Sequence, residues 1–168
     1  MNTRKMTLLG LLIAVALLAT YIEYLLPSPI ASMPGIKLGL ANVIILALLY
    51  LFHSKTSLYV NILRILLAAL LFTGFIGGMY ALVGGFFSFI SMYLAKRSSV
   101  FSILGVSVIG ATSHNVGQIL VSAIILQNRK LFYYLPILTI SAIITGLIVG
   151  LIAFYLVRHL STYCKKFI

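Results

Sequence analysis

Long apolar segments alternate with short polar connections along the whole chain. The apolar segments cover residues 6–26, 37–52, 56–73, 79–95, 101–126 and 132–157. Most of them approach or exceed the ~20 residues that an α-helix needs to cross the hydrocarbon core of a bilayer. We therefore predict an all-α membrane protein with six transmembrane helices, forming a single domain over residues 1–168.

The connections differ in character. Residues 27–35 contain three prolines and end in a glycine, which predicts an extended loop rather than a helix. Residues 73–78 are expected to form a very short return loop between the third and fourth helices. The basic residues before segment 6–26 are also compatible with a signal peptide, but the apolar segments that follow favour a retained first helix.

Composition and charge support a membrane location and give an orientation. The chain is 62% hydrophobic and only 8% charged, whereas about a quarter of the residues of a soluble domain are charged. Basic residues lie mainly at the ends of apolar segments, so the net charge of +11 does not indicate a nucleic-acid-binding surface.

The positions of the basic residues also predict the orientation in the membrane. Six spans place both termini on one side. With that side cytoplasmic, the following basic residues lie inside: Arg4, Lys5, Lys55, Lys96, Arg97, Arg158, Lys165 and Lys166. Only Lys37, Arg129 and Lys130 lie outside, so we expect cytoplasmic termini and a multi-pass protein of the cytoplasmic membrane.

Polar residues interrupt the fifth apolar segment at residues 110–118. His114, Asn115 and Gln118 are three or four residues apart and share one helix face. Such groups are costly in lipid unless they face protein or a wet cavity. They could form a polar seam between helices or line a ligand pocket. In the predicted orientation they converge, in a cup open to the outside, with the following residues: Glu23, Lys37, Asn42 and Arg64.

Arg64 carries the most specific signal. A guanidinium in the middle of a transmembrane helix costs on the order of 3 kcal/mol on insertion scales and needs an anion or several carbonyl groups. Glu23 is the only carboxylate side chain of the protein, and Lys37 competes for it. A bound phosphate would balance the excess positive charge. Alternatively, Arg64 could bind backbone carbonyls and Lys37 could contact lipid headgroups.

Several other activities are disfavoured. His114 could relay protons with Glu23, but without nearby Cys, Asp or a second His it makes a poor metal site. We therefore expect no metal. A phosphate-binding Walker loop is missing, and the lack of any aspartate rules out a Ser/His/Asp triad. The single cysteine, Cys164, cannot form an intrachain disulfide.

Three motifs resemble one known family. Residues 34–42, 64–68 and 114–118 resemble the Gx transporter family, also labelled heptaprenyl diphosphate synthase component I, over nearly the whole chain. That family is similar to the substrate-binding S components of energy-coupling factor transporters and to flavin transporters associated with redox complexes. The resemblance implies a six-helix bundle with an outward-open pocket and with the loop 27–36 as its gate.

The resemblance also implies a ligand and partners. It implies transport of a flavin nucleotide, FMN or FAD, as ligand rather than as catalytic cofactor. Lys37 and Arg64 would neutralise its phosphate, and the remaining polar residues of the cup would orient it: Asn42, His114, Asn115 and Gln118. An energy-coupling module or an extracytoplasmic flavin transferase would be the partner. The small-xxx-small pair Gly10 and Ala14 supports docking of such a module only weakly.

The label heptaprenyl diphosphate synthase component I implies a different chemistry from flavin transport. Prenyl diphosphate synthesis needs Mg²⁺ held between diphosphate and carboxylates, and this chain has no aspartate-rich motif. We therefore expect a protein that is not an enzyme. The alternatives to flavin transport are a noncatalytic membrane subunit associated with heptaprenyl diphosphate synthesis and an S component for another vitamin.

Overall fold

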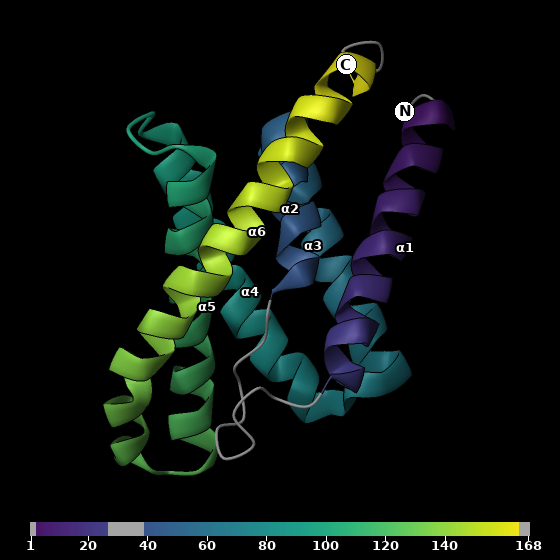
Figure 1. Cartoon of the computed structure of the whole chain (residues 1–168). Helices are drawn as coiled ribbons and strands as arrows, with labels where there is room; N and C mark the ends of the chain where they lie inside the picture. Colours follow the sequence, from purple (N-terminus) through teal and green to yellow (C-terminus); the bar gives the residue numbers. More distant parts are fainter. Residues whose placement is uncertain (1–2, 27–38, 165–168) are drawn as a thin grey trace.

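The computed structural model describes residues 3–26 and 39–164, in which every regular element is helical (Figure 1). The expected all-α class is therefore confirmed. The elements are α1 (Thr3–Leu25), α2 (Leu40–Leu51), α3 (Ser54–Ala68), η1 (Ala69–Thr73), α4 (Gly74–Arg97), α5 (Ile103–Ile125), η2 (Arg129–Tyr134) and α6 (Leu135–Cys164). The predicted gate, residues 27–36, lies outside the described residues.

The helices run alternately up and down the bundle (Figure 1). α5 packs against both α4 and α6, while α2 contacts α1, α3 and α6. The start of α1 and the end of α6 lie at the same end of the bundle (Figure 1), as an even number of spans requires. That this end faces the cytoplasm stays a prediction.

Four helical stretches are long and apolar enough to cross a membrane. They are Met6–Leu25, Ser54–Arg97, Ile103–Ile125 and Arg129–Ser161. The second of these has 44 residues and covers α3, η1 and α4. α2 has only 12 residues and is shorter than a spanning helix. A multi-pass helical membrane protein follows, and the count of six spans stays a prediction.

The predicted return loop at residues 73–78 is wrong. Residues 69–73 form a π-helical turn, and α4 begins directly at Gly74. Gly74 has φ 68° and ψ 179°, values that suit glycine and interrupt the helical path. The chain turns back between α3 and α4 (Figure 1). Gly77 and Gly78 keep this turn tight, because a Cβ at either would lie within 3.0 Å of Thr73 or Ala69. The sequence pattern shows these glycines but does not distinguish this turn from a short loop.

The short helix α2 forms the centre of the core. Nine of its residues are buried: Ala41, Val43, Ile44, Ile45, Leu46, Ala47, Leu48, Leu49 and Leu51. A helix that is apolar all round, as α2 is, is stable only when other helices surround it. At its C-terminal end Lys96 of α4 donates a hydrogen bond from Nζ to the Leu49 carbonyl oxygen at 2.6 Å.

Glycines allow α5 to approach its neighbours closely. A Cβ built at Gly117 of α5 would lie 2.9 Å from the Gly84 Cα of α4. A Cβ at Gly146 of α6 would lie 2.8 Å from the Val108 Cα of α5. Close backbone approach through small residues is a common basis of helix association in membranes. These contacts fix the face of α5 that carries His114 and Gln118.

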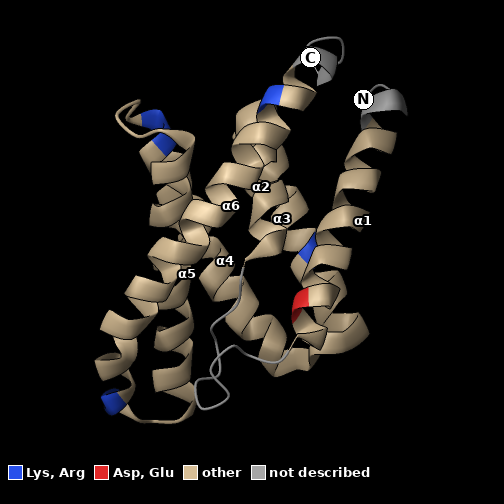
Figure 2. Ribbon diagram, viewed as in Figure 1, with Lys and Arg blue, Asp and Glu red and all other residues tan. Residues whose placement is uncertain are grey.

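The distribution of charge agrees with a membrane bundle. Basic side chains lie mostly near the ends of helices, with one inside the bundle, next to the acidic residue on α1 (Figure 2). The acidic residue is Glu23, the only one in the chain, and the basic residue is Arg64 of α3. This pair lies beside the cavity described next.

Candidate ligand-binding cavity

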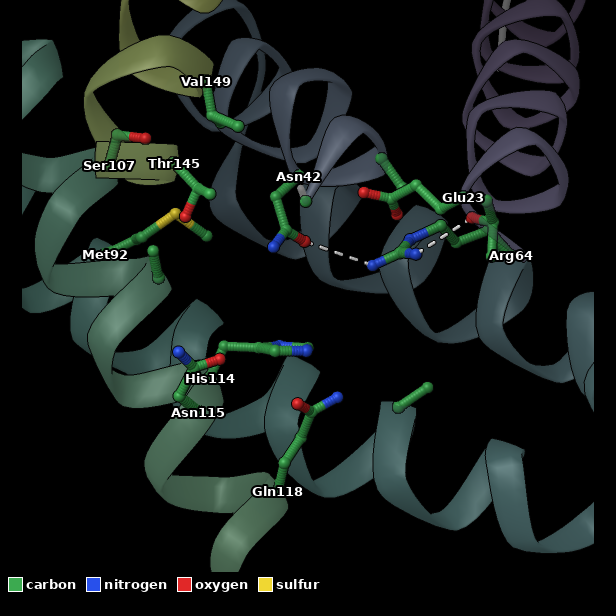
Figure 3. Close-up of a pocket in the computed structure, with 15 residues that line it drawn as sticks. Glu23, Asn42, Arg64, Met92, Ser107, His114, Asn115, Gln118, Thr145 and Val149 are labelled. Carbon is green, nitrogen blue, oxygen red and sulfur yellow. Dashed lines mark hydrogen bonds between the residues drawn. The ribbon is translucent and has the colours of Figure 1, made fainter. Parts of the chain in front are cut away.

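All six α-helices contribute to one cavity of about 60 Å³, which both polar and apolar side chains line (Figure 3). The residues that line it are Thr20, Glu23, Gly39, Ala41, Asn42, Arg64, Ala81, Met92, Ser107, Ala111, His114, Asn115, Gln118, Thr145 and Val149. Charged and amide side chains gather around it although the surrounding helices are strongly apolar. Because they are buried inside the protein, these groups avoid the free-energy cost of contact with lipid.

Arg64 is held by side chains from three helices. Its Nε and Nη2 donate to Asn61 Oδ1 at 3.2 and 2.9 Å. Nη1 donates to Thr20 Oγ1 at 3.2 Å, and Nη2 also donates to Asn42 Oδ1 at 3.3 Å. The Thr20 hydroxyl itself donates to the Ala16 carbonyl at 2.8 Å, so its lone pairs face the guanidinium. The side chain is only 6% exposed, which leaves little contact with solvent.

All of these hydrogen-bond acceptors are neutral. Amide and hydroxyl oxygens orient a guanidinium and satisfy its donors, but they do not cancel its charge as a carboxylate would. Nη1 carries two hydrogens and donates one of them to Thr20. Arg64 itself lines the cavity, where the carboxylate of Glu23 acts on its charge.

Glu23 links α1 to the N-terminus of α2. Its Oε1 accepts a hydrogen bond from the Leu40 backbone N–H at 2.7 Å. The preceding residue, Gly39, has φ 75° and gives this helix start no side-chain cap. A carboxylate at a helix N-terminus satisfies an unpaired N–H group and matches the helix dipole. Glu23 and Arg64 thus line the same cavity with opposite charges (Figure 3).

α5 forms the opposite wall of the cavity. His114, Asn115 and Gln118 point from it toward the lining residues of other helices (Figure 3). Asn115 Nδ2 donates to the Leu138 carbonyl of α6 at 3.0 Å, which fixes the orientation of its amide. The Gln118 side chain is 8% exposed and makes no hydrogen bond with the part of the chain that the structure describes. A buried amide that faces a cavity in this way is suited to bind a water molecule or a ligand.

Gly84 of α4 makes room for this wall. A Cβ at that position would lie 2.9 Å from His114 Cε1 and 3.1 Å from Gln118 Cγ. Any larger residue at position 84 would require both side chains to shift. The described residues contain no group of three or more His, Cys, Asp or Glu side chains that could hold a metal ion.

A comparison with protein families assigns the chain to one family. The profile of the family described as heptaprenyl diphosphate synthase component I matches residues 12–156. The chain belongs to the heptaprenyl diphosphate synthase component I family. This confirms the family expected from the three motifs. The matched range contains every residue named above as lining the cavity. Comparisons with curated proteins and with solved structures give no significant match.

In this family member most of the residues predicted to form the site come together. Asn42, Arg64, His114, Asn115 and Gln118 all line the cavity, as does the predicted charge partner Glu23. Lys37 lies outside the described residues. The binding of a substrate by these residues stays a prediction.

Other residues around the site were missed by sequence reasoning. Asn61 lies three residues before Arg64 on the same helix face, but the sequence does not show that it accepts two guanidinium hydrogen bonds. Thr20 and Ser107 are each one of several hydroxyl residues in otherwise apolar helices. Such residues commonly bond to their own helix backbone, so the sequence offers no signal that distinguishes them.

Proposed function

We propose that this protein binds a small phosphate-bearing molecule at Arg64, within the cytoplasmic membrane, and is not itself an enzyme. The observation that carries this proposal is the buried guanidinium, which is bonded to neutral oxygens and adjoins a cavity. Removing a charge from water costs several kcal/mol, and the nearby carboxylate of Glu23 offsets part of this cost for Arg64. A phosphate would offset that cost and would use the guanidinium fork, which matches its geometry.

The size of the cavity limits which part of a ligand it holds. Its volume of about 60 Å³ is well below the ~300–1,000 Å³ of pockets that enclose whole drug-sized ligands. It is enough for a compact group such as a phosphate. A flavin ring would need the surrounding helices to separate, or would have to lie beyond the described lining.

The first candidate ligand is a flavin nucleotide, FMN or FAD, carried across the membrane. Its phosphate would bind Arg64, and its ring edge would meet the hydrogen-bonding groups of Asn42, His114, Asn115 and Gln118. The Gln118 amide, which has no hydrogen-bond partner among residues 3–26 and 39–164, supports a polar group on that side. An energy-coupling module or an extracytoplasmic flavin transferase would then be the partner, with Lys37 as a second cation.

The second candidate is a noncatalytic membrane subunit for heptaprenyl diphosphate synthesis. The family description favours it, because it names this pathway and does not name flavin transport. The cavity volume also suits it, since only the diphosphate of a prenyl diphosphate would have to fit. Its apolar chain could remain in the lipid between helices. The absence of aspartate from the chain supports a noncatalytic role, because diphosphate chemistry with Mg²⁺ uses carboxylates.

Binding measurements with the purified protein in lipid nanodiscs test the proposal and separate the candidates. The probes are FMN, riboflavin, pyrophosphate and a prenyl diphosphate. We expect pyrophosphate to compete with the bound probe, and riboflavin to bind more weakly than FMN. FMN absorbance in the purified protein would favour flavin transport, whereas tighter binding of prenyl diphosphate would favour the second candidate. Failure of all phosphate-bearing probes to bind would overturn the proposal.

A further inference from the structure

Asn61 lies behind Arg64 and does not line the cavity. Its side chain is 3% exposed, and its amide has only one orientation that satisfies its neighbours. Nδ2 donates to the Gly85 carbonyl of α4 at 3.3 Å. Oδ1 must then face Arg64, where it accepts from Nε and Nη2 at 3.2 and 2.9 Å. Asn61 therefore connects the backbone of α4 to the guanidinium on α3.

Gly85 makes this connection possible. A Cβ at Gly85 would lie 2.9 Å from Ile65 Cδ1 and 3.3 Å from Asn61 Nδ2. A side chain at this position would separate α3 from α4 and push the amide away from the carbonyl. Gly85, Asn61 and Arg64 thus form one connected unit, which we call the Arg64 support.

The chemistry of an amide suits this position. A carboxylate with the same shape would also accept from Nε and Nη2, but it would form a buried ion pair and neutralise the guanidinium. An amide oxygen accepts the same hydrogen bonds and leaves the positive charge in place. An alanine would leave the charge but would remove the bonds that aim it.

We propose that Asn61 is a positioning residue for anion binding: it aims Arg64 at the cavity and, being neutral, leaves the charge of Arg64 for the ligand. This inference rests on the proposed function, because it assumes that a phosphate group binds Arg64. It adds a residue outside the cavity that sets the preference for phosphate-bearing over phosphate-free ligands.

Asn61→Asp tests this most sharply, because it keeps the shape of the side chain. A carboxylate oxygen cannot donate to the Gly85 carbonyl, so we expect the variant to melt at a lower temperature than the wild type and to bind FMN and pyrophosphate at least about 30-fold more weakly. Binding of riboflavin should change less than threefold. Asn61→Ala should weaken FMN binding by about 10-fold and lower the melting temperature. A purely structural role would change the melting temperature without changing the ratio of FMN to riboflavin affinity.

Two further variants keep the test decisive. Asn128→Asp makes the same substitution at an exposed residue whose side chain caps the Lys130 N–H at 3.0 Å, and it should leave FMN binding unchanged. Gly85→Ala disturbs the same support from α4, and it should reduce the preference for FMN even where Asn61→Asp does not fold.

The outcomes separate this inference from the proposed function. Failure of the wild type to bind FMN and pyrophosphate would overturn both. Wild-type binding that is lost in Arg64→Gln but retained in Asn61→Asp and Gly85→Ala would overturn the role of Asn61 alone. Loss of the FMN preference in Asn61→Asp, with Asn128→Asp unchanged, would establish it.

Discussion

Both ends of α2 meet a charged side chain from another helix, but the surroundings of the two ends differ. At the N-terminal end Glu23 accepts the Leu40 N–H at 2.7 Å, and Arg64 lies beside the same cavity. At the C-terminal end Lys96 donates to the Leu49 carbonyl at 2.6 Å, and its Nζ lies 5.0 Å from the centre of the Tyr50 ring. Lys96 does not line the cavity.

Arg64 and Lys96 differ in what surrounds their charges. The environment of Lys96 accounts for its charge, because carbonyls at a helix C-terminus and the face of an aromatic ring both attract cations. Arg64 has only neutral acceptors among its hydrogen-bond partners, and open space lies next to it. A cation that contacts α2 therefore does not by itself indicate a binding site, and the cavity beside Arg64 is what supports our proposal for that residue.

The largest effect is expected at Arg64. Arg64→Gln removes the charge and the fork, and truncating one partner of a buried charge pair costs ~2–5 kcal/mol. We expect FMN and pyrophosphate to bind about 100-fold more weakly, measured by fluorescence quenching and competition. Lys96→Gln is the matched control, because it also removes one basic side chain that contacts α2. Equal losses of FMN affinity in the two variants would contradict the proposal that the N-terminal end of α2, and not its C-terminal end, lies at the binding site.

The next effect concerns the wall opposite Arg64. Gly84→Ala would place a Cβ 2.9 Å from His114 Cε1 and 3.1 Å from Gln118 Cγ, so these two cavity-lining side chains must shift. Overpacking of this kind costs ~1–3 kcal/mol, and we expect a loss of about 10-fold in FMN affinity. Gly10→Ala provides the control, because nothing lies within 4 Å of its Cβ position. An unchanged FMN affinity in Gly84→Ala would exclude this wall from the site.

A smaller effect, of opposite sign, is expected at Glu23. Glu23→Gln keeps an acceptor for the Leu40 N–H but removes the negative charge from the cavity. Less repulsion, worth ~1 kcal/mol at the effective dielectric of a protein, should raise the affinity for FMN and pyrophosphate about fivefold. Riboflavin provides the uncharged comparison. A weaker affinity for pyrophosphate would mean that the carboxylate helps to bind the ligand rather than competing with it.

The smallest effect on binding is expected at Lys96. Lys96→Gln loses the charge-assisted bond to the Leu49 carbonyl, which should lower the free energy of unfolding by ~1 kcal/mol. FMN affinity should stay within about twofold of the wild type. Thermal unfolding in nanodiscs, followed by circular dichroism, checks the first part. A large loss of affinity at normal stability would place the C-terminal end of α2 in the binding site.

Much of the fold could be predicted because apolar length and its interruptions depend on local sequence. The predicted segments 6–26, 56–73 and 101–126 differ from the observed helices by only a few residues. The reversal between the third and fourth helices was predicted, but as a loop over residues 73–78, since a π-helical turn followed directly by α4 cannot be distinguished from a short loop in the sequence. The meeting of Asn42, Arg64 and Gln118 could be predicted, because alternating helix directions bring residues of similar depth together.

The support behind Arg64 could not be predicted in the same way. Asn61 and Gly85 are 24 residues apart and lie on different helices, and their contact depends on how α3 and α4 rotate against each other. Helix rotation is set by packing of many apolar side chains, which a pattern of hydrophobic positions does not resolve. The same holds for Thr20, whose hydroxyl faces Arg64 across α1 and α3.

The most direct test of the central claim is an experimental structure of the protein with pyrophosphate bound. The account predicts a phosphate oxygen in the cavity, about 2.7–2.9 Å from a guanidinium nitrogen of Arg64, with Asn61 still accepting from the other side. Pyrophosphate bound only among basic residues at the helix ends would contradict the account. In that result Arg64 would keep its bonds to Asn61, Thr20 and Asn42 beside a cavity without phosphate.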